Sequence, residues 1–90
     1  MYILTIEGRE SEGAYSVQNE EGENILYLFE EQDDAVRYAM MLEEKDYPEM
    51  HVMEVDPAAM LSLCQNYDYE YTIITANDIV IPPDIEYDTI

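Results

Sequence analysis

The chain contains 90 residues, 48% of them hydrophobic, and its 22 acidic residues against 3 basic ones give a formal net charge of −19. This length suffices for one small domain with a single core, and the hydrophobic content excludes wholesale disorder. Binding to nucleic-acid phosphates is also excluded, because Arg9, Arg37 and Lys45 are too few to replace the displaced counterions. The charge favours a basic protein surface or a cation as partner, although the acids can equally form only a solvated surface.

The start of the chain and its single cysteine bear on location. Residues 1–7 lack the basic start of a signal peptide and reach an acid at Glu7. No apolar run approaches the roughly 20 residues of a membrane-spanning helix. Cys64 has no second cysteine to pair with, which suits a reducing compartment. We therefore expect a cytoplasmic protein that is not inserted into a membrane.

The first third of the chain predicts three strands. Residues 2–6 alternate in polarity and are rich in β-branched and aromatic side chains, as is typical of a strand. Residues 14–18 form a second strand, and residues 24–30 a third. Apolar side chains occupy both faces of this third strand, with Ile25, Tyr27 and Phe29 on one and Leu26 and Leu28 on the other. That pattern indicates a central strand that is covered on both sides.

The remainder of the chain predicts two helices and two strands. These elements are a helix at residues 32–46, a strand at 50–55, a helix at 57–66 and a strand at 71–76. Asp33 and Asp34 open the first helix, where the helix dipole favours carboxylates, and Pro48 follows its end. Asp56 and Pro57 are a strong start for the second helix, as N-cap and first helical residue.

The element order β-β-β-α-β-α-β predicts an α+β fold. Each strand-helix-strand unit should be a right-handed crossover, and we expect both helices on the same face of the sheet. The expected architecture is a ferredoxin-like two-layer sandwich, with about five strands and two helices on one face. We assign residues 1–83 to a single domain and residues 84–90 to an acidic C-terminal tail.

Short motifs spread along the chain resemble a known family. They are Glu12-Gly13, Leu28-Phe29-Glu30, Asp33-Asp34-Ala35, Arg37-Tyr38-Ala39, Leu42-Glu43, Asp46-Tyr47-Pro48, Asp56, Cys64-Gln65 and Pro82-Pro83. Together they are similar to a family of short, acidic proteins from cyanobacteria and plant plastids that carries only the label of a domain of unknown function. The chain has Tyr15 where similar sequences have histidine, which argues against a histidine site here. The resemblance implies a cytoplasmic or stromal protein in a photosynthetic cell, and it brings no activity.

Few residues offer catalytic or ligand chemistry. Cys64 and His51 are the single thiol and imidazole, and catalysis by such a pair requires contact between them. His51 lies in a predicted strand and Cys64 joins the apolar stripe of the second helix, so we expect a buried structural thiol and an exposed histidine. The acidic clusters lack the spacing of a calcium loop, and no phosphate loop or metal-binding Cys/His spacing occurs. We expect no enzymatic activity, no metal site and no cofactor.

Nine tyrosines are the remaining feature of the sequence. Tyr67, Tyr69 and Tyr71 alternate, so an extended segment would place them on one face, where Tyr15 and Tyr27 of neighbouring strands would enlarge an aromatic patch. Tyrosine is enriched in interfaces and also packs in cores, and both interpretations remain open.

From these features we expect a small noncatalytic binding or regulatory protein. It would dock an acidic, tyrosine-bearing surface onto a basic protein partner in a photosynthetic cell. The candidate binding residues are Asp33, Asp34, Tyr67, Tyr69 and Tyr71. The alternative is a small-molecule-binding ferredoxin-like module in which two copies form a homodimer around a ligand.

Overall fold

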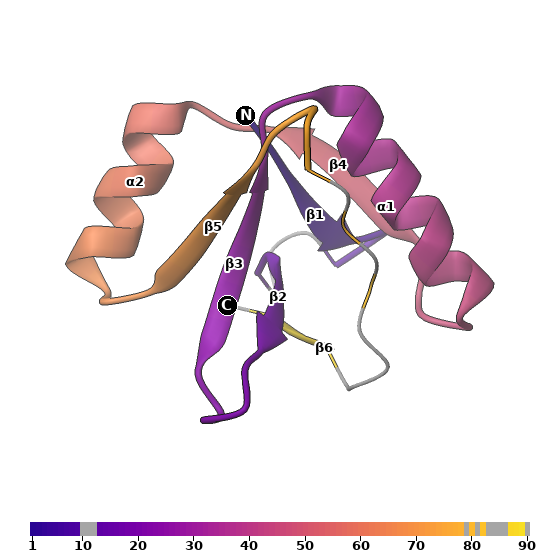
Figure 1. The fold of residues 1–90 in the computed structure, drawn as a ribbon, viewed down its shortest axis with the longest axis horizontal. Helices are drawn as coiled ribbons and strands as arrows, with labels where there is room; N and C mark the ends of the chain where they lie inside the picture. Colours follow the sequence, from indigo (N-terminus) through magenta and orange to yellow (C-terminus); the bar gives the residue numbers. More distant parts are fainter. Residues whose placement is uncertain (10–12, 79, 81, 83–86, 90) are drawn as a thin grey trace.

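The computed structural model describes residues 1–9, 13–78, 80, 82 and 87–89 (Figure 1). Its elements are β1 (Tyr2–Ile6), β2 (Tyr15–Gln18), β3 (Asn24–Phe29), α1 (Gln32–Glu44), β4 (Met50–Glu54), α2 (Pro57–Asn66), β5 (Glu70–Ile74) and β6 (Tyr87–Thr89). The α+β class and the order β-β-β-α-β-α-β are therefore confirmed. Neither of the two helices in the described part of the chain is long and apolar enough to cross a membrane.

The strands form one sheet of six, with β3 at its centre. β1 is antiparallel to both β3 and β4, whereas all of β5 runs parallel to residues 25–29 of β3. β2 is antiparallel to the first half of β3. β6 lies in the expected acidic tail, where it pairs with β2, and it is a sixth strand where about five were expected.

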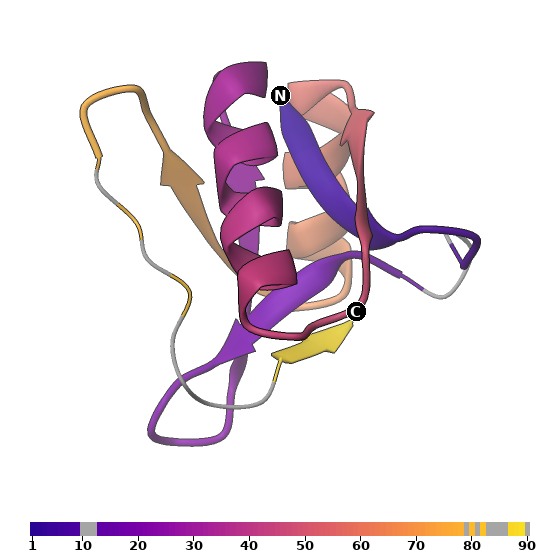
Figure 2. The ribbon, with the colours of Figure 1, turned by 90° about the vertical axis from the view of Figure 1, so that its right-hand side faces the viewer.

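The two helices cover opposite faces of this sheet, so the expectation of two layers with both helices on one face is wrong. α1 packs against Leu4, Phe29 and Ile74. α2 packs on the other face. There, Cys64, Met60 and Leu61 of α2 form a separate cluster with Ile3, Leu26 and Leu28 of the strands. In Figure 2, α1 lies in front of the sheet and α2 behind it, with β5 at the left edge.

The direction of the two crossovers explains this arrangement. β3, β4 and β5 all point the same way, because β3 and β4 are each antiparallel to β1 and β5 is parallel to β3. The α1 crossover leads from β3 past β1 to β4, and the α2 crossover leads back from β4 to β5 on the other side of β3. Two right-handed crossovers that run in opposite directions between parallel strands must use opposite faces.

The helix starts differ in how their free N–H groups are satisfied. At α2, the side chain of Asp56 accepts a hydrogen bond of 2.9 Å from the backbone N–H of Ala59, and Pro57 occupies the first turn. At α1, the N-cap Glu31 makes no such side-chain bond. α1 instead carries Asp33 and Asp34 in its first turn, where the helix dipole favours carboxylates.

This difference predicts unequal effects of alanine at the two caps. Asp56→Ala should lower the free energy of unfolding by about 1 kcal/mol, because the first turn of α2 loses a hydrogen-bond acceptor. Glu31→Ala, the matched control, should change it by less than about 0.5 kcal/mol. Chemical denaturation of both variants measures this, and equal losses would contradict the assignment of Asp56 as the only side-chain cap of the two.

Candidate functional site

The structure separates the five candidate binding residues into two groups. Asp33 and Asp34 lie at the start of α1, just beyond Phe29, which pairs with Ile74 at the last residue of β5. Tyr67 and Tyr69 lie in the connection between α2 and β5, and Tyr71 is the second residue of β5. The two groups therefore do not combine into one surface.

The two aspartates also differ in availability. Asp33 is exposed. Only 13% of the Asp34 side chain is exposed, and its Oδ1 accepts a 3.1 Å hydrogen bond from Arg37. Asp34 thus neutralises a cation of its own helix. Both residues line a hollow of about 200 Å³ that α1 forms with Ala76, Asp78 and Val80. Asp34 is poorly placed to meet a basic partner.

The tyrosines lie on an exposed apolar surface that we call the α2–β5 face. It comprises Leu63, Tyr67, Tyr71 and Ile73, which are 40%, 63%, 41% and 37% exposed, together with the half-buried Tyr69. The rings of Tyr67 and Tyr69 stack with centroids 5.7 Å apart and an interplanar angle of 18°. Tyr71 and Ile73 project on the same side of the sheet as their fully buried neighbours Leu26 and Leu28.

This face is exposed because α2 covers its side of the sheet incompletely. Within α2, Cys64 is the single fully buried residue, whereas α1 buries Ala35, Tyr38, Ala39 and Leu42. An open hollow of about 190 Å³ remains between α2 and the sheet. Its lining is mainly apolar and includes Ile3, Ala14, Leu26, Met53, Met60 and Leu63, with Thr5 and Tyr69 as polar exceptions.

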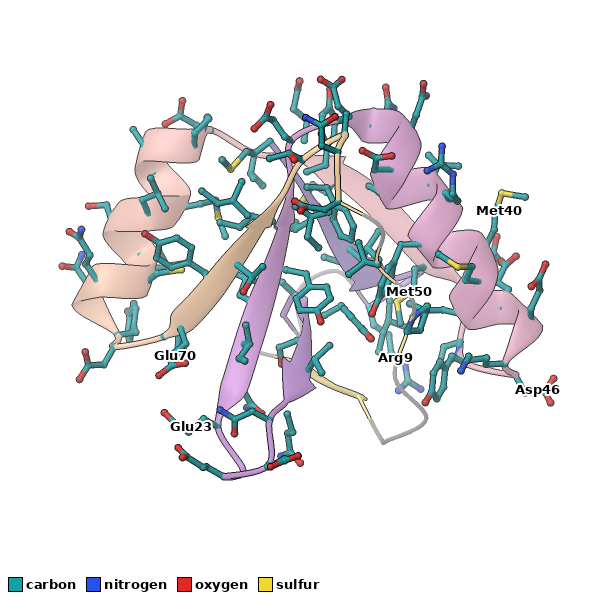
Figure 3. All side chains as sticks on the ribbon, in the orientation of Figure 1. Arg9, Glu23, Met40, Asp46, Met50 and Glu70 are labelled. Atoms are coloured by element: carbon teal, nitrogen blue, oxygen red, sulfur yellow. The ribbon has the colours of Figure 1, made fainter. Side chains whose placement is uncertain are left out.

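Carboxylates border the α2–β5 face at the start of β5. Glu70 and Glu23, labelled in Figure 3, belong to neighbouring strand starts that the parallel register brings together. A hydrogen bond with the Glu23 carboxyl, followed by the repulsion of its negative charge, raises the pKa of Glu70. No lysine or arginine follows Lys45 in the sequence. The surface therefore combines exposed apolar groups with negative charge.

Tyr15 and Tyr27 do not contribute to this surface, contrary to the expected larger aromatic patch. Both pack on the α1 side of the sheet, where Tyr15 is buried and Tyr27 is half-buried. Their rings meet that of Tyr38 edge to face, at centroid distances of 5.6 and 5.7 Å. The hydroxyls of Tyr15 and Tyr38 lie 2.9 Å apart, so each buried hydroxyl has a partner.

This tyrosine pair predicts a loss of stability at alkaline pH. Burial raises the pKa of Tyr15 to about 12, and burial and the hydrogen bond to Tyr15 raise that of Tyr38 still further. Because the folded state favours the protonated phenols, their contribution is complete below the unfolded pKa of about 10. It is lost as the pH rises from about 10 through about 12, by up to about 3 kcal/mol for Tyr15.

The measurement is urea unfolding as a function of pH, with phenolate absorbance as the second signal. The double variant Tyr15→Phe/Tyr38→Phe should lose much of this alkaline decline. Tyr67→Phe, at an exposed ring, should keep it. An unchanged decline in the double variant would contradict the role of the buried pair.

The thiol and the imidazole have different surroundings. Cys64 packs with Ile3, Leu26 and Leu28, and burial raises the pKa of its thiol. His51 is exposed, and its Nδ1 lies 3.6 Å from an oxygen of Glu7. The expected buried cysteine and exposed histidine are thus confirmed, and the raised pKa keeps the thiol a poor nucleophile near neutral pH.

Cys64 should therefore contribute to stability alone. Cys64→Ala should lower the free energy of unfolding by about 1 kcal/mol, since it removes a buried sulfur. Cys64→Ser should cost more, because it buries a hydroxyl among apolar side chains. Thiol labelling of the native protein should be slow and should accelerate on unfolding, and rapid native labelling would contradict a structural role.

Metal-ligating side chains do not converge in the described ranges: no three His, Cys, Asp or Glu residues there are placed to hold an ion. The expectations of no metal site, no cofactor and no enzymatic activity stay predictions.

Comparison with known protein families gives one match. The family model described as "Domain of unknown function (DUF3110)" matches residues 1–84. No curated protein and no solved structure matches the chain.

Proposed function

The chain belongs to the DUF3110 family, a domain of unknown function, and we propose that it is a noncatalytic binding or regulatory protein that docks onto a basic protein partner. The observation that supports this most strongly is the α2–β5 face, where exposed apolar residues adjoin carboxylates. We assign docking to this face and thus to Tyr67, Tyr69 and Tyr71. Asp33 contributes to the long-range field, and Asp34, held by Arg37, makes no direct contact.

Composition and charge support a protein partner. Tyrosine is over-represented in interface cores, and large exposed aromatic side chains that cluster on one face supply most of the energy in such contacts. The net charge of −19 would attract a basic surface over long range and speed its encounter. Apolar contact would then determine how long the complex lasts.

The setting of this interaction is a proposal of the same kind. The resemblance of the motifs to sequences from cyanobacteria and plastids supports a cytoplasmic or stromal location in a photosynthetic cell. The partner would then belong to that cell's energy or gene-expression machinery.

A small-molecule-binding dimer is the second candidate, and the hollow beside α2 favours it. Its apolar lining would suit a small apolar ligand. Two observations make it the weaker candidate: few polar groups line the hollow to orient a ligand, and two chains of charge −19 repel each other.

Matched surface variants test the docking proposal. Tyr67→Ser/Ile73→Ser removes apolar contact from the α2–β5 face. Met40→Ser/Val36→Ser is the control, since Met40 and Val36 are 59% and 40% exposed on α1. The first variant should speed dissociation of a partner captured from native lysate by about tenfold or more, because it deletes contact residues. The control should leave the rate unchanged within about twofold. Equal effects of the two variants would contradict docking at this face.

Charge variants test the electrostatic part of the same proposal. Glu70→Lys and Asp33→Lys alter the net charge equally, but only Glu70 borders the α2–β5 face. Association should slow in both variants at low salt, and more in Glu70→Lys, because local charges act most strongly at the contact. Raising the salt concentration should weaken binding of the unmodified protein, and salt-independent affinity would contradict this part.

A further inference from the structure

Strand β5 has one paired and one unpaired edge. It pairs with β3, and no strand among the described residues pairs with its opposite edge. Figure 2 shows β5 at the lateral end of the sheet, on the far side of β3 from β1 and β4. Four of its five residues, Glu70 to Ile73, are exposed.

The hydrogen bonds identify which backbone groups face outward. The N–H of Glu30, the residue after β3, donates to the carbonyl of Ile74 at 2.9 Å. Residues 70, 72 and 74 therefore direct their N–H and C=O groups toward β3, since both groups of a strand residue point to the same edge. Tyr71 and Ile73 direct theirs to the open edge.

The outward N–H groups before Tyr71 and after Ile73 already donate hydrogen bonds within the chain. The N–H of Tyr69 donates to the carbonyl of Cys64 at 2.8 Å. The N–H of Thr75 donates to Oδ2 of Asp78, also at 2.8 Å. The open stretch is thus limited to Tyr71 and Ile73, with its ends closed by contacts within the chain.

Proteins ordinarily protect such an edge with lysine, proline or a bulge. β5 contains neither lysine nor proline, and its register with β3 is continuous from Glu70 to Ile74. The edge of β4 differs, because its outward apolar residues are covered: Met50 is buried and Val52 half-buried in the core beneath α1. Of the two edge strands whose side chains the structure describes, β4 and β5, only β5 has outward residues that also carry exposed apolar side chains.

We propose that an extended, basic segment of the partner pairs with β5 and adds a strand to the sheet. This inference rests on the proposed docking function and specifies its mode. Such β-strand addition draws affinity from main-chain hydrogen bonds and specificity from alternate side chains. One face of the segment would meet Tyr71 and Ile73, so it should be apolar. The other would meet Glu70 and Thr72, so it should carry lysine or arginine.

Charge selects this occupant over a second copy of the chain. Asp68 and Glu70 stand at one end of the open stretch and Asp78 at the other. Pairing β5 with β5 of another copy would bring these carboxylates and two net charges of −19 together. A basic segment would instead neutralise them.

Peptide binding to the full isotope-labelled chain tests the proposal. The probe is a synthetic peptide of about eight residues that alternates lysine and valine, long enough for one strand. Its matched control has the same sequence with N-methyl groups on the backbone nitrogens of one edge, which removes donors without changing charge. We expect the control to bind about tenfold or more weakly. In NMR hydrogen exchange, the unmodified peptide should protect the amides of Tyr71 and Ile73 and leave that of Val52 unchanged.

A protein variant gives an independent measurement. Ile73→Pro removes one outward N–H. An edge strand tolerates proline at such a position, where the N–H faces solvent. The substitution should weaken peptide binding about tenfold, whereas Ile73→Val should keep it within about twofold. If Ile73→Pro fails to fold, the N-methylated peptide still decides the question.

The possible failures are distinguishable. Equal binding of the two peptides, or binding without protection of Tyr71 and Ile73, would overturn strand addition and leave docking at this face intact. Strand addition would also be overturned if a helical peptide of equal charge bound and the alternating peptide did not. If neither the alternating nor the helical peptide bound, strand addition by a basic segment would be overturned. The proposed docking function would then stand or fall on the dissociation rate of the Tyr67→Ser/Ile73→Ser variant alone.

Discussion

The arrangement of this protein depends on β3, a strand that must be covered on both faces. Leu26, Leu28 and Phe29 are all fully buried, although Phe29 points to the opposite side from the two leucines. One helix cannot cover both sides of a strand. The chain meets this constraint by reversing the direction of its second crossover, which places α2 behind the sheet and β5 along the free edge of β3.

That solution leaves the two sides unequally covered. α1 buries four residues and closes an aromatic core, whereas α2 is shorter, buries Cys64 alone and leaves a hollow beside it. The strand that α2 leads into consequently has Tyr71 and Ile73 exposed. Exposed apolar area on an otherwise compact domain is a common mark of an interaction surface. The candidate site is thus a consequence of the fold's asymmetry, and it requires no special motif.

The local elements could be predicted from the sequence, but their assembly could be predicted only in part. Asp56 and Pro57 determine the start of α2 through contacts within four residues, and the two-sided apolar pattern of β3 identified it as a central strand. Which face of the sheet each helix covers depends on where β5 joins the sheet. That position is set by long-range pairing with β3, and no local sequence pattern predicts it. The apolar side chains on both faces of β3 indicated that each face is covered. That indication was already inconsistent with a two-layer sandwich, in which both helices lie on one face. Tyr15 and Tyr71 look alike in sequence, and their separation into core and surface follows from that long-range pairing.

The strong negative charge acquires a structural role once the open edge of β5 is considered. An edge strand with exposed apolar residues and no lysine or proline would readily pair with its own copies. Repulsion between chains of charge −19 opposes that encounter over a distance of about 8–10 Å at moderate ionic strength. The same field would attract the basic segment proposed above, so one property would both oppose self-pairing and favour the proposed partner. On this argument the acids need no individual binding role, and their number matters more than their positions, except at Glu70, where charge and the open edge meet.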